Sequence, residues 1–206
     1  MKLYHVPGSR SARVLWLLHE LDLPHEVERL SMADGSLRSP EYLAIHPLGR
    51  VPALEDEGTT FYESGAIVQY LLERYGQGRL EPPVGGPDRA HYLQWFHWGE
   101  ATLLPPIVAM NANRFALPEK DRSEKAIDVA QRQLARILGV LERALDGRRY
   151  LVGDGFTAAD LMVGYGVTLA KLVGELSGDL PAVQGWLGRL AARPAYAAAL
   201  AGGFAG

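Results

Sequence analysis

Cysteine is absent from this 206-residue chain. Its absence excludes a disulfide scaffold, a zinc ribbon, an iron–sulfur cluster and any enzyme whose nucleophile is its own thiol. Long hydrophobic runs are also missing, because no apolar stretch reaches the ~18 residues of a membrane-spanning helix. The first residues, MKLYHVPGSR, lack the apolar region of a signal peptide. We therefore expect a soluble, cytoplasmic protein with no membrane partner.

An excess of basic charge is missing as well. The chain has 21 Lys and Arg residues against 24 Asp and Glu residues, a formal net charge of -3. A surface that tracks a phosphate backbone needs clustered positive charge, so nucleic acid is not an expected partner. With 48% hydrophobic and 22% charged residues, the composition is that of a globular protein able to bury a core without metals or disulfides.

Several catalytic motifs are absent too. The sequence contains no G-x-G-x-x-G, no G-K-[ST] phosphate loop, no G-x-S-x-G elbow and no H-E-x-x-H pair. Its six histidines lack the spacing of metal ligands. The sequence therefore predicts no metal, no nucleotide cofactor and no esterase chemistry.

Strand and helix signals alternate in the N-terminal part of the chain. Turn residues such as Pro7-Gly8 and Glu57-Gly58 separate short β-type runs from amphipathic segments. The order β-α-β-α-β-β-α predicts a small α/β domain with a mixed four-stranded sheet. The expected strands cover residues 2–6, 25–30, 51–55 and 59–62, and the expected helices begin at Ser11, Pro40 and Ser64.

The remainder of the chain predicts helices only. A stretch rich in Gly and Pro predicts a linker at 77–87 between a first domain, 1–76, and an all-helical domain, 88–206. A helix over 88–115 should be kinked by Pro105-Pro106. A second helix is expected from residue 117, and a third from Thr157-x-x-Asp160, which resembles a capping box that serves folding. Two short helices, 182–191 and 195–200, complete the pattern.

The turn after the first strand holds two serines. Ser9 and Ser11 lie between a strand end and a helix N-terminus, a position that favours anions. For Ser11 the simpler interpretation is the N-cap of the helix. One helix needs only one cap, so Ser9 is left as the candidate functional hydroxyl.

Two further dipeptides stand at the starts of elements. Pro52 lies at the start of the third strand. If the Val51-Pro52 bond is cis, the Val51 backbone is available to pair with an extended peptide. Base rates alone favour a trans bond, since only ~5% of X-Pro bonds are cis. Ser64 is a candidate N-cap, and its N–H and hydroxyl also suit a carboxylate, while Glu63 suits an ammonium. Together Glu63 and Ser64 match the free α-carbon end of an amino acid or of a γ-linked peptide.

These segments together resemble the glutathione transferases. The chain contains PGSRSAR before a helix, then HPLGRVPAL, FYESGAI, a Pro/Gly linker and a helical second half. The resemblance covers essentially the whole chain, and GRVPAL followed by ESGAI is the specific part. It implies a thioredoxin-like first domain that binds glutathione, a second domain that supplies most of the pocket for a hydrophobic electrophile, a detoxification role and a homodimer.

The resemblance assigns roles by position. Ser9 falls where serine-type members keep the hydroxyl that activates the thiol, with Ser11 nearby; Tyr4 fits the alternative tyrosine role poorly. Glutathione is a co-substrate in this family, not a cofactor. Its expected contacts are Val51, which precedes Pro52, with Glu63 and Ser64 at the γ-glutamyl end and Arg38 and Arg50 as weaker candidates for the glycyl carboxylate.

The electrophile pocket and the exact reaction are less constrained. Four residues near the end of the long helix are candidates for the electrophile pocket: Met110, Asn113, Arg114 and Phe115. Core packing explains Met110 and Phe115 equally well. The expected reaction is conjugation of glutathione to small electrophiles. The alternatives are a glutathione-dependent peroxidase or disulfide reductase and a non-catalytic binding module of the same fold.

Overall fold

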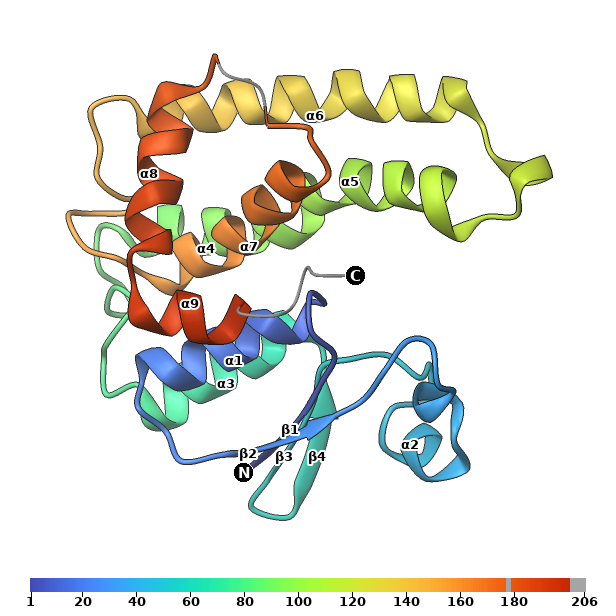
Figure 1. Ribbon diagram of the computed structural model, residues 1–206. Helices are drawn as coiled ribbons and strands as arrows, with labels where there is room; N and C mark the ends of the chain where they lie inside the picture. The colour runs from blue at the N-terminus through green and yellow to red at the C-terminus, as the bar shows by residue number, and fades with distance from the viewer. Residues whose placement is uncertain (177–178, 201–206) are drawn as a thin grey trace. The chain divides into compact units, whose positions relative to one another are not determined.

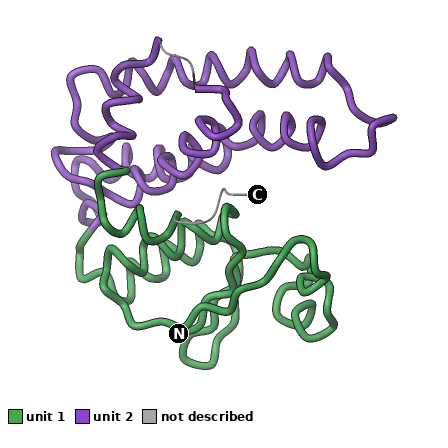
Figure 2. The backbone as a smooth tube through the Cα atoms, viewed as in Figure 1, with its two compact units in different colours: residues 1–79, 191–206 green, residues 80–190 purple. Residues whose placement is uncertain are grey.

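A computed structural model describes residues 1–176 and 179–200 of the chain. The chain divides into two compact units, which Figure 2 distinguishes by colour. The first contains Met1–Arg79 together with the helix α9, Pro194–Leu200, and the second is Leu80–Leu190. This division differs from the predicted second domain, 88–206, because α9 packs against helix α1, Ser11–Glu20, of the first unit.

The first unit is built on a four-stranded mixed sheet, as predicted (Figure 1). Its strand order is β2-β1-β3-β4, with β1 parallel to β2 and antiparallel to β3, and β3 antiparallel to β4. The strands are β1 Lys2–His5, β2 Glu26–Arg29, β3 Ala53–Asp56 and β4 Thr59–Tyr62. The β3–β4 turn places Glu57 and Gly58 at φ values of 46° and 78°, which is typical of a two-residue hairpin.

Helices cover both faces of this sheet. Successive side chains of a strand point to opposite faces, so Leu3 and Leu54, both fully buried, face α1 and α3, Ser64–Tyr75. On the other face Tyr4 and Ala53 pack with Tyr42 of α2, Pro40–Ile45. The apolar stripe of α1 is buried, and so is the leucine that follows the helix: Val14, Leu15, Leu17, Leu18 and Leu21.

The last helix fixes the outer side of α1 within the same unit. Arg193 donates two hydrogen bonds of 2.6 Å to the Glu20 carboxylate, and Trp16 Nε1 donates to Glu20 at 2.9 Å. The ring of Tyr196 meets that of Trp16 edge-on at 5.0 Å. These contacts account for the burial of Trp16 and of the Glu20 side chain on this side of α1.

The second unit is helical, as predicted. Its long N-terminal helix is a succession of segments: α4 Arg89–Trp98, a π-helical stretch η2 Gly99–Leu103, α5 Leu104–Asn111 and a second π-helical stretch η3 Ala112–Ala116. The Pro105-Pro106 interruption therefore follows directly on a change of helical register, consistent with a lost backbone donor. A Cβ on Gly99 would lie 2.7 Å from the Met162 carbonyl oxygen, which shows how closely η2 approaches α7, Ala158–Leu172.

The remaining helices differ slightly from their predicted limits. The helix expected from residue 117 is wrong at its start: a 3₁₀ turn, η4 Glu119–Asp121, precedes α6, Glu124–Leu145, whose N-cap is Ser123. Thr157 and Asp160 form the predicted capping box at the start of α7. Helix α8, Pro181–Ala191, completes the unit.

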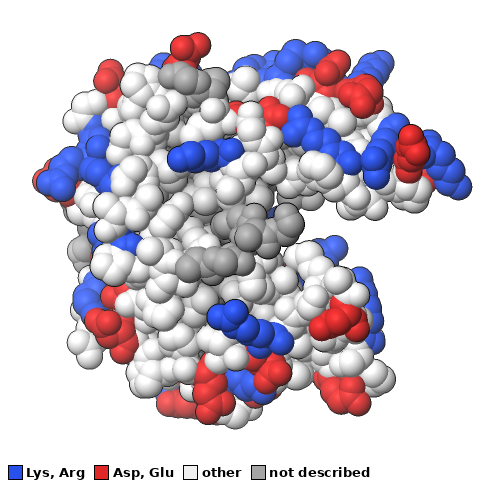
Figure 3. Space-filling view, in the orientation of Figure 1, with Lys and Arg blue, Asp and Glu red and all other residues white. Residues whose placement is uncertain are grey.

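Among the described residues, no helix combines the length and apolar character needed to cross a membrane. On the face drawn in Figure 3, Lys and Arg side chains are interspersed with those of Asp and Glu.

Candidate functional site

The turn between β1 and α1 brings Ser9 and Ser11 together. Their hydroxyl oxygens lie 2.7 Å apart, and Ser9 Oγ lies 2.7 Å from the Val6 carbonyl oxygen. The Ser11 N–H donates to Ser9 Oγ at 3.3 Å. Ser11 is fully buried, whereas Ser9 is half-buried. Ser9 is therefore the hydroxyl of this pair that a bound ligand can reach.

The N-cap interpretation is wrong for both Ser11 and Ser64. Helix α1 starts at Ser11 with Arg10 as its N-cap, and α3 starts at Ser64 with Glu63 as its N-cap; neither cap side chain bonds to its helix. Each serine is already the first helical residue, so its hydroxyl does not reach a free N–H of its own helix. Both hydroxyls instead contact other elements.

One partner of the Ser11 hydroxyl is a buried histidine. His5, only 3% exposed at the end of β1, places Nδ1 2.8 Å from Ser11 Oγ. Burial, with the positive charge of Arg29 as a smaller contribution, lowers the pKa of His5 to about 4. His5 is therefore neutral at physiological pH. We call Ser9, Ser11 and His5 the serine cluster, in which His5 takes part as a neutral imidazole.

The partner of the Ser64 hydroxyl is an arginine of α1. Arg13 is fully buried, and its Nη1 donates to Ser64 Oγ at 3.3 Å. A buried guanidinium beside the start of α3 gives this corner a positive potential, which adds to that of the helix N-terminus. The preceding Glu63 is exposed and has φ 78°, a conformation that non-glycine residues adopt rarely.

The segment before β3 contains Val51 and Pro52. The Val51-Pro52 peptide bond is cis. The carbonyl of Arg50, the residue before Val51, accepts a hydrogen bond of 2.5 Å from Tyr42. Arg38 and Arg50 are exposed, and Arg38 Nη1 donates to the Leu48 carbonyl at 2.9 Å.

A second buried histidine connects this segment to Glu63. His46 stacks on Tyr62 with ring centroids 4.4 Å apart, and its Nδ1 accepts the Leu48 N–H. Desolvation lowers the pKa of His46, with smaller and opposed effects of Glu63 and Arg50. The three groups are thus close enough to interact, which places the segment before β3 beside the end of β4.

Tyr4 is occupied elsewhere, in agreement with its poor fit to a thiol-activating role. It is 6% exposed, its hydroxyl donates to Glu55 at 2.7 Å, and its ring packs on Tyr42 at 5.4 Å. Burial and the Glu55 contact raise the pKa of Tyr4. A tyrosine held in this way is not free to donate to a ligand.

The four electrophile-pocket candidates occupy different environments within the second unit. Met110 is fully buried and Phe115 is 72% exposed. Arg114 forms an ion pair of 2.5 Å with Glu175, which Gln131 also contacts. Asn113 connects α5 to α6 by accepting from the Ser123 N–H and donating to the Ala109 carbonyl. Their participation in a substrate pocket stays a prediction.

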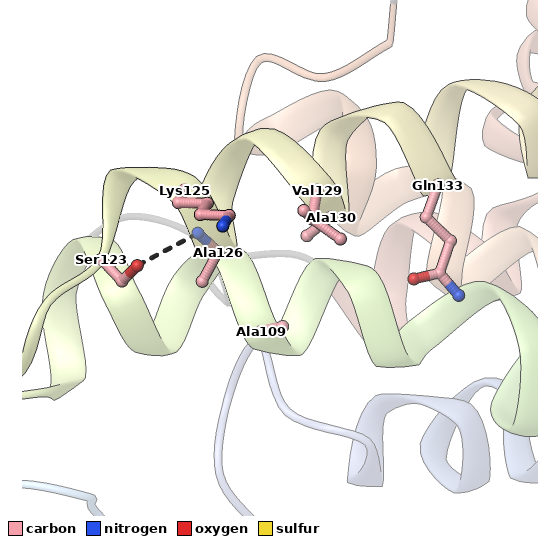
Figure 4. Close-up of a pocket in the computed structure, with 7 residues that line it drawn as sticks. All are labelled: Ala109, Ser123, Lys125, Ala126, Val129, Ala130 and Gln133. Atoms are coloured by element: carbon pink, nitrogen blue, oxygen red, sulfur yellow. Dashed lines mark hydrogen bonds between the residues drawn. The ribbon is translucent and has the colours of Figure 1, made fainter.

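A shallow pocket of about 380 Å³ lies between α5 and α6 (Figure 4). Small and aliphatic side chains form its floor, and Lys125 and Gln133 stand at its sides. None of the four candidates lines it, although Asn113 bonds to two of its lining residues. The lining residues are Ala109, Ser123, Lys125, Ala126, Val129, Ala130 and Gln133.

Sequence reasoning missed His5 and Arg13 as parts of the site. His5 lies two residues after the buried Leu3 in β1, so its side chain points to the same face of the sheet, toward α1. Arg13 is flanked by apolar residues of α1. A polar side chain at a position that the pattern predicts to be buried is the signal that marks both, because buried polar groups need partners.

Two family models match this chain. The glutathione S-transferase N-terminal domain matches residues 3–82, and the glutathione S-transferase C-terminal domain matches residues 103–194. The first match contains every residue of the serine cluster and of the Glu63–Ser64 corner.

Known proteins are similar over nearly the whole length. The chain is 33% identical to glutathione S-transferase F13 of Arabidopsis thaliana, over 95% of this chain and 93% of the relative. It is also 33% identical to the glutathione S-transferase-like protein tpcF of Aspergillus fumigatus, over 93% and 90%. A glutathione transferase homologue from Lodderomyces elongisporus, crystallised with two glutathione molecules per subunit, superposes with a TM-score of 0.86 at 25% identity, over 97% and 96% of the two chains.

Proposed function

This chain belongs to the glutathione S-transferase family, and we propose that it transfers small hydrophobic electrophiles to the sulfur of glutathione. In that reaction the thiolate attacks an electrophilic carbon, a C–S bond forms, and the leaving group departs with the bonding electron pair. Ser9 is the proposed catalytic residue, and it acts as a hydrogen-bond donor to the sulfur. The observation that carries the proposal is the half-buried Ser9 hydroxyl at the start of α1.

The energetic requirement is modest. A free thiol with a pKa of ~8.5 is only a few per cent ionised at pH 7. Lowering that pKa by ~2 units requires about 2.7 kcal/mol of preference for the thiolate. A hydrogen bond to a charged group contributes ~1.5–3 kcal/mol and a helix N-terminus ~0.3–1 kcal/mol. Ser9 and the N-terminus of α1 therefore suffice without a general base.

The glutathione contacts follow from the same part of the first unit. The proposed γ-glutamyl seat is Glu63 with Ser64, where buried Arg13 adds positive charge behind the Ser64 hydroxyl. The Val51 backbone, next to the cis bond to Pro52, is the proposed partner of the cysteinyl part. Arg38 and Arg50 are proposed to meet the glycyl carboxylate.

The remaining assignments extend the proposal beyond the first unit. Met110, Asn113, Arg114 and Phe115 are proposed to contribute to the electrophile pocket. We further propose a cytoplasmic homodimer. A glutathione-dependent peroxidase or disulfide reductase is the second candidate activity; without cysteine, it would run through the sulfur of glutathione alone.

Two assays test this function. We expect conjugation of an aromatic halide to exceed reduction of a hydroperoxide, each at equal enzyme and glutathione concentrations. Calorimetric titration with glutathione separates an enzyme from a non-catalytic module. Absence of binding at millimolar glutathione would contradict both activities and favour the module.

Removing the Glu63 charge should weaken glutathione binding. We expect Glu63→Gln to raise the Kd for glutathione about tenfold, because a charged hydrogen bond contributes ~1.5–3 kcal/mol. Ser64→Ala should have a similar effect, while kcat at saturating glutathione stays near the wild-type value. Calorimetry gives the Kd, and Glu73→Gln, an exposed change of equal charge on α3, is the matched control. An unchanged Kd for Glu63→Gln would show that the γ-glutamyl seat is misplaced.

A further inference from the structure

The serine cluster contains three short contacts that run from the base of the turn to its accessible side. His5 Nδ1 lies 2.8 Å from Ser11 Oγ, Ser11 Oγ lies 2.7 Å from Ser9 Oγ, and Ser9 Oγ lies 2.7 Å from the Val6 carbonyl oxygen. The alternation of β1 places His5 on the α1 side of the sheet with Leu3. The imidazole therefore lies behind the hydroxyl that is proposed to meet the sulfur.

Counting protons assigns the tautomer of His5. A hydroxyl carries one proton, so the two serines supply two protons for the three contacts of 2.7–2.8 Å, each between atoms that bear a lone pair. Ser11 Oγ also lies 3.2 Å from the Val6 carbonyl oxygen, a longer contact, and accepts the Val6 N–H at 3.2 Å. Two such atoms 2.7–2.8 Å apart with no proton between them repel each other. The third proton must come from His5, which is neutral; its Nδ1 therefore carries the hydrogen and donates to Ser11 Oγ.

The directions of the two remaining short bonds follow from this assignment and from the distances. Ser11 Oγ accepts from His5 and from the Val6 N–H, and its single proton goes to Ser9 Oγ at 2.7 Å, which is nearer than the Val6 carbonyl oxygen at 3.2 Å. Ser9 in turn donates to the Val6 carbonyl at 2.7 Å. Ser9 Oγ thus accepts from the Ser11 hydroxyl and from the Ser11 N–H at 3.3 Å, which fills both of its acceptor positions. When Ser9 turns its proton toward a ligand, the Val6 carbonyl keeps the Ser9 N–H as a donor at 3.2 Å.

A hydroxyl whose acceptor positions are both filled distinguishes a thiolate from a thiol. It can donate to a thiolate, but it cannot accept the proton of a thiol. Successive bonds of one direction also polarise each other and strengthen the terminal donor. The cluster therefore favours the ionised form of a sulfur placed at Ser9.

We propose that His5 is a positioning residue that fixes the proton order His5 to Ser11 to Ser9 and so makes Ser9 a one-way donor to the glutathione sulfur. The inference rests on the proposed role of Ser9. His5 does not need to gain or lose a proton for this role. Arg29, opposite His5 in the β1–β2 register, disfavours the imidazolium form.

Two substitutions at His5 separate donation from packing. His5→Leu fills the buried space without a donor, whereas the side-chain amide of His5→Asn can present an N–H near the position of Nδ1. We expect His5→Leu to raise the pKa of the bound glutathione thiol by about half a unit to one unit. We expect His5→Asn to stay near the wild-type value. The thiolate absorbance of the glutathione complex, followed against pH, measures this pKa, with circular dichroism to confirm folding.

A double-mutant cycle tests the path through Ser11. The shift for His5→Leu with Ser11→Ala should not exceed that of Ser11→Ala alone, because both changes break the same chain. Additive shifts would overturn the inference. His25→Asn is the control, since the His25 Nδ1 bonds to the Leu23 carbonyl at 2.7 Å, two residues away in the sequence, and the change should leave the thiol pKa unchanged.

A measurement on the wild-type protein covers the case in which His5→Leu fails to fold. Nitrogen NMR of the histidine side chains should show His5 protonated at Nδ1, and protonation at Nε2 alone would overturn the inference. An ionised wild-type thiol with an unshifted pKa in folded His5→Leu would overturn it while leaving the proposed function intact. A wild-type thiol that titrates at its free value would contradict the proposed function itself.

Discussion

Replacing Asp160 by alanine is expected to lower the free energy of unfolding by about 3–5 kcal/mol. The carboxylate is fully buried and accepts four hydrogen bonds of 2.9–3.1 Å, from the Leu151 N–H, the Thr157 N–H and hydroxyl, and Trp186 Nε1. Burial raises the pKa of Asp160 and the four donors oppose that rise. Its removal leaves four buried donors unpaired, each at a cost of ~1–3 kcal/mol before water enters.

Urea unfolding monitored by tryptophan fluorescence measures this effect, and the thermal midpoint should fall by about 10 °C. Asp154→Ala, an exposed aspartate in the loop before α7, should change stability by less than about 0.5 kcal/mol. A stability of Asp160→Ala within about 1 kcal/mol of wild type would show that the buried network does not hold the start of α7 and the middle of α8 together.

Replacing Ser9 by alanine should return the bound thiol toward its free pKa. If the donor accounts for most of a ~2-unit shift, the ionised fraction at pH 7 falls roughly 25-fold. The less stabilised thiolate is intrinsically more nucleophilic, which offsets part of that loss. We expect kcat/KM at pH 7 to fall about three- to tenfold, while the Kd for glutathione changes little.

The pH dependence distinguishes this role from a structural one. The loss should disappear as pH rises through the thiol pKa of the variant, because glutathione is then ionised in both proteins. Ser31→Ala, at another half-buried serine of the first unit, is the control and should behave as wild type. A loss that is constant from pH 6 to pH 9 would point to disturbed packing, and unchanged kinetics would transfer the role to Ser11 or to a backbone amide.

Elements with strong local signals could be predicted from the sequence. The hairpin at Glu57-Gly58, the apolar stripe of α1 and the Thr157–Asp160 box each depend on residues close in sequence, and all three are present. The start of α6 could not, because Pro118 and Glu119 satisfy the rules for a helix start but begin a 3₁₀ turn instead.

The residue types of the candidate site stand out in the sequence, but their contacts do not. Ser9, Glu63 and Ser64 stand out in the sequence, yet the cap assignment fails for Ser11 and Ser64 because their partners lie on other elements. His5 contacts Ser11 across the β1–α1 turn, and Arg13 contacts Ser64 from a position 51 residues away. The sequence pattern can mark His5 and Arg13 as buried polar residues, but it does not give their partners, and propensity rules therefore assign these serines to caps.

The ionisation of glutathione in the wild-type complex tests the central claim most directly. The thiolate absorbance of saturated protein, corrected for the free protein, should be titrated from pH 5 to pH 10. The account predicts a midpoint about 2 units below the ~8.5 of a free thiol, so that most of the bound sulfur is ionised at pH 7. A midpoint at the free value, in a complex that binds glutathione, would contradict it.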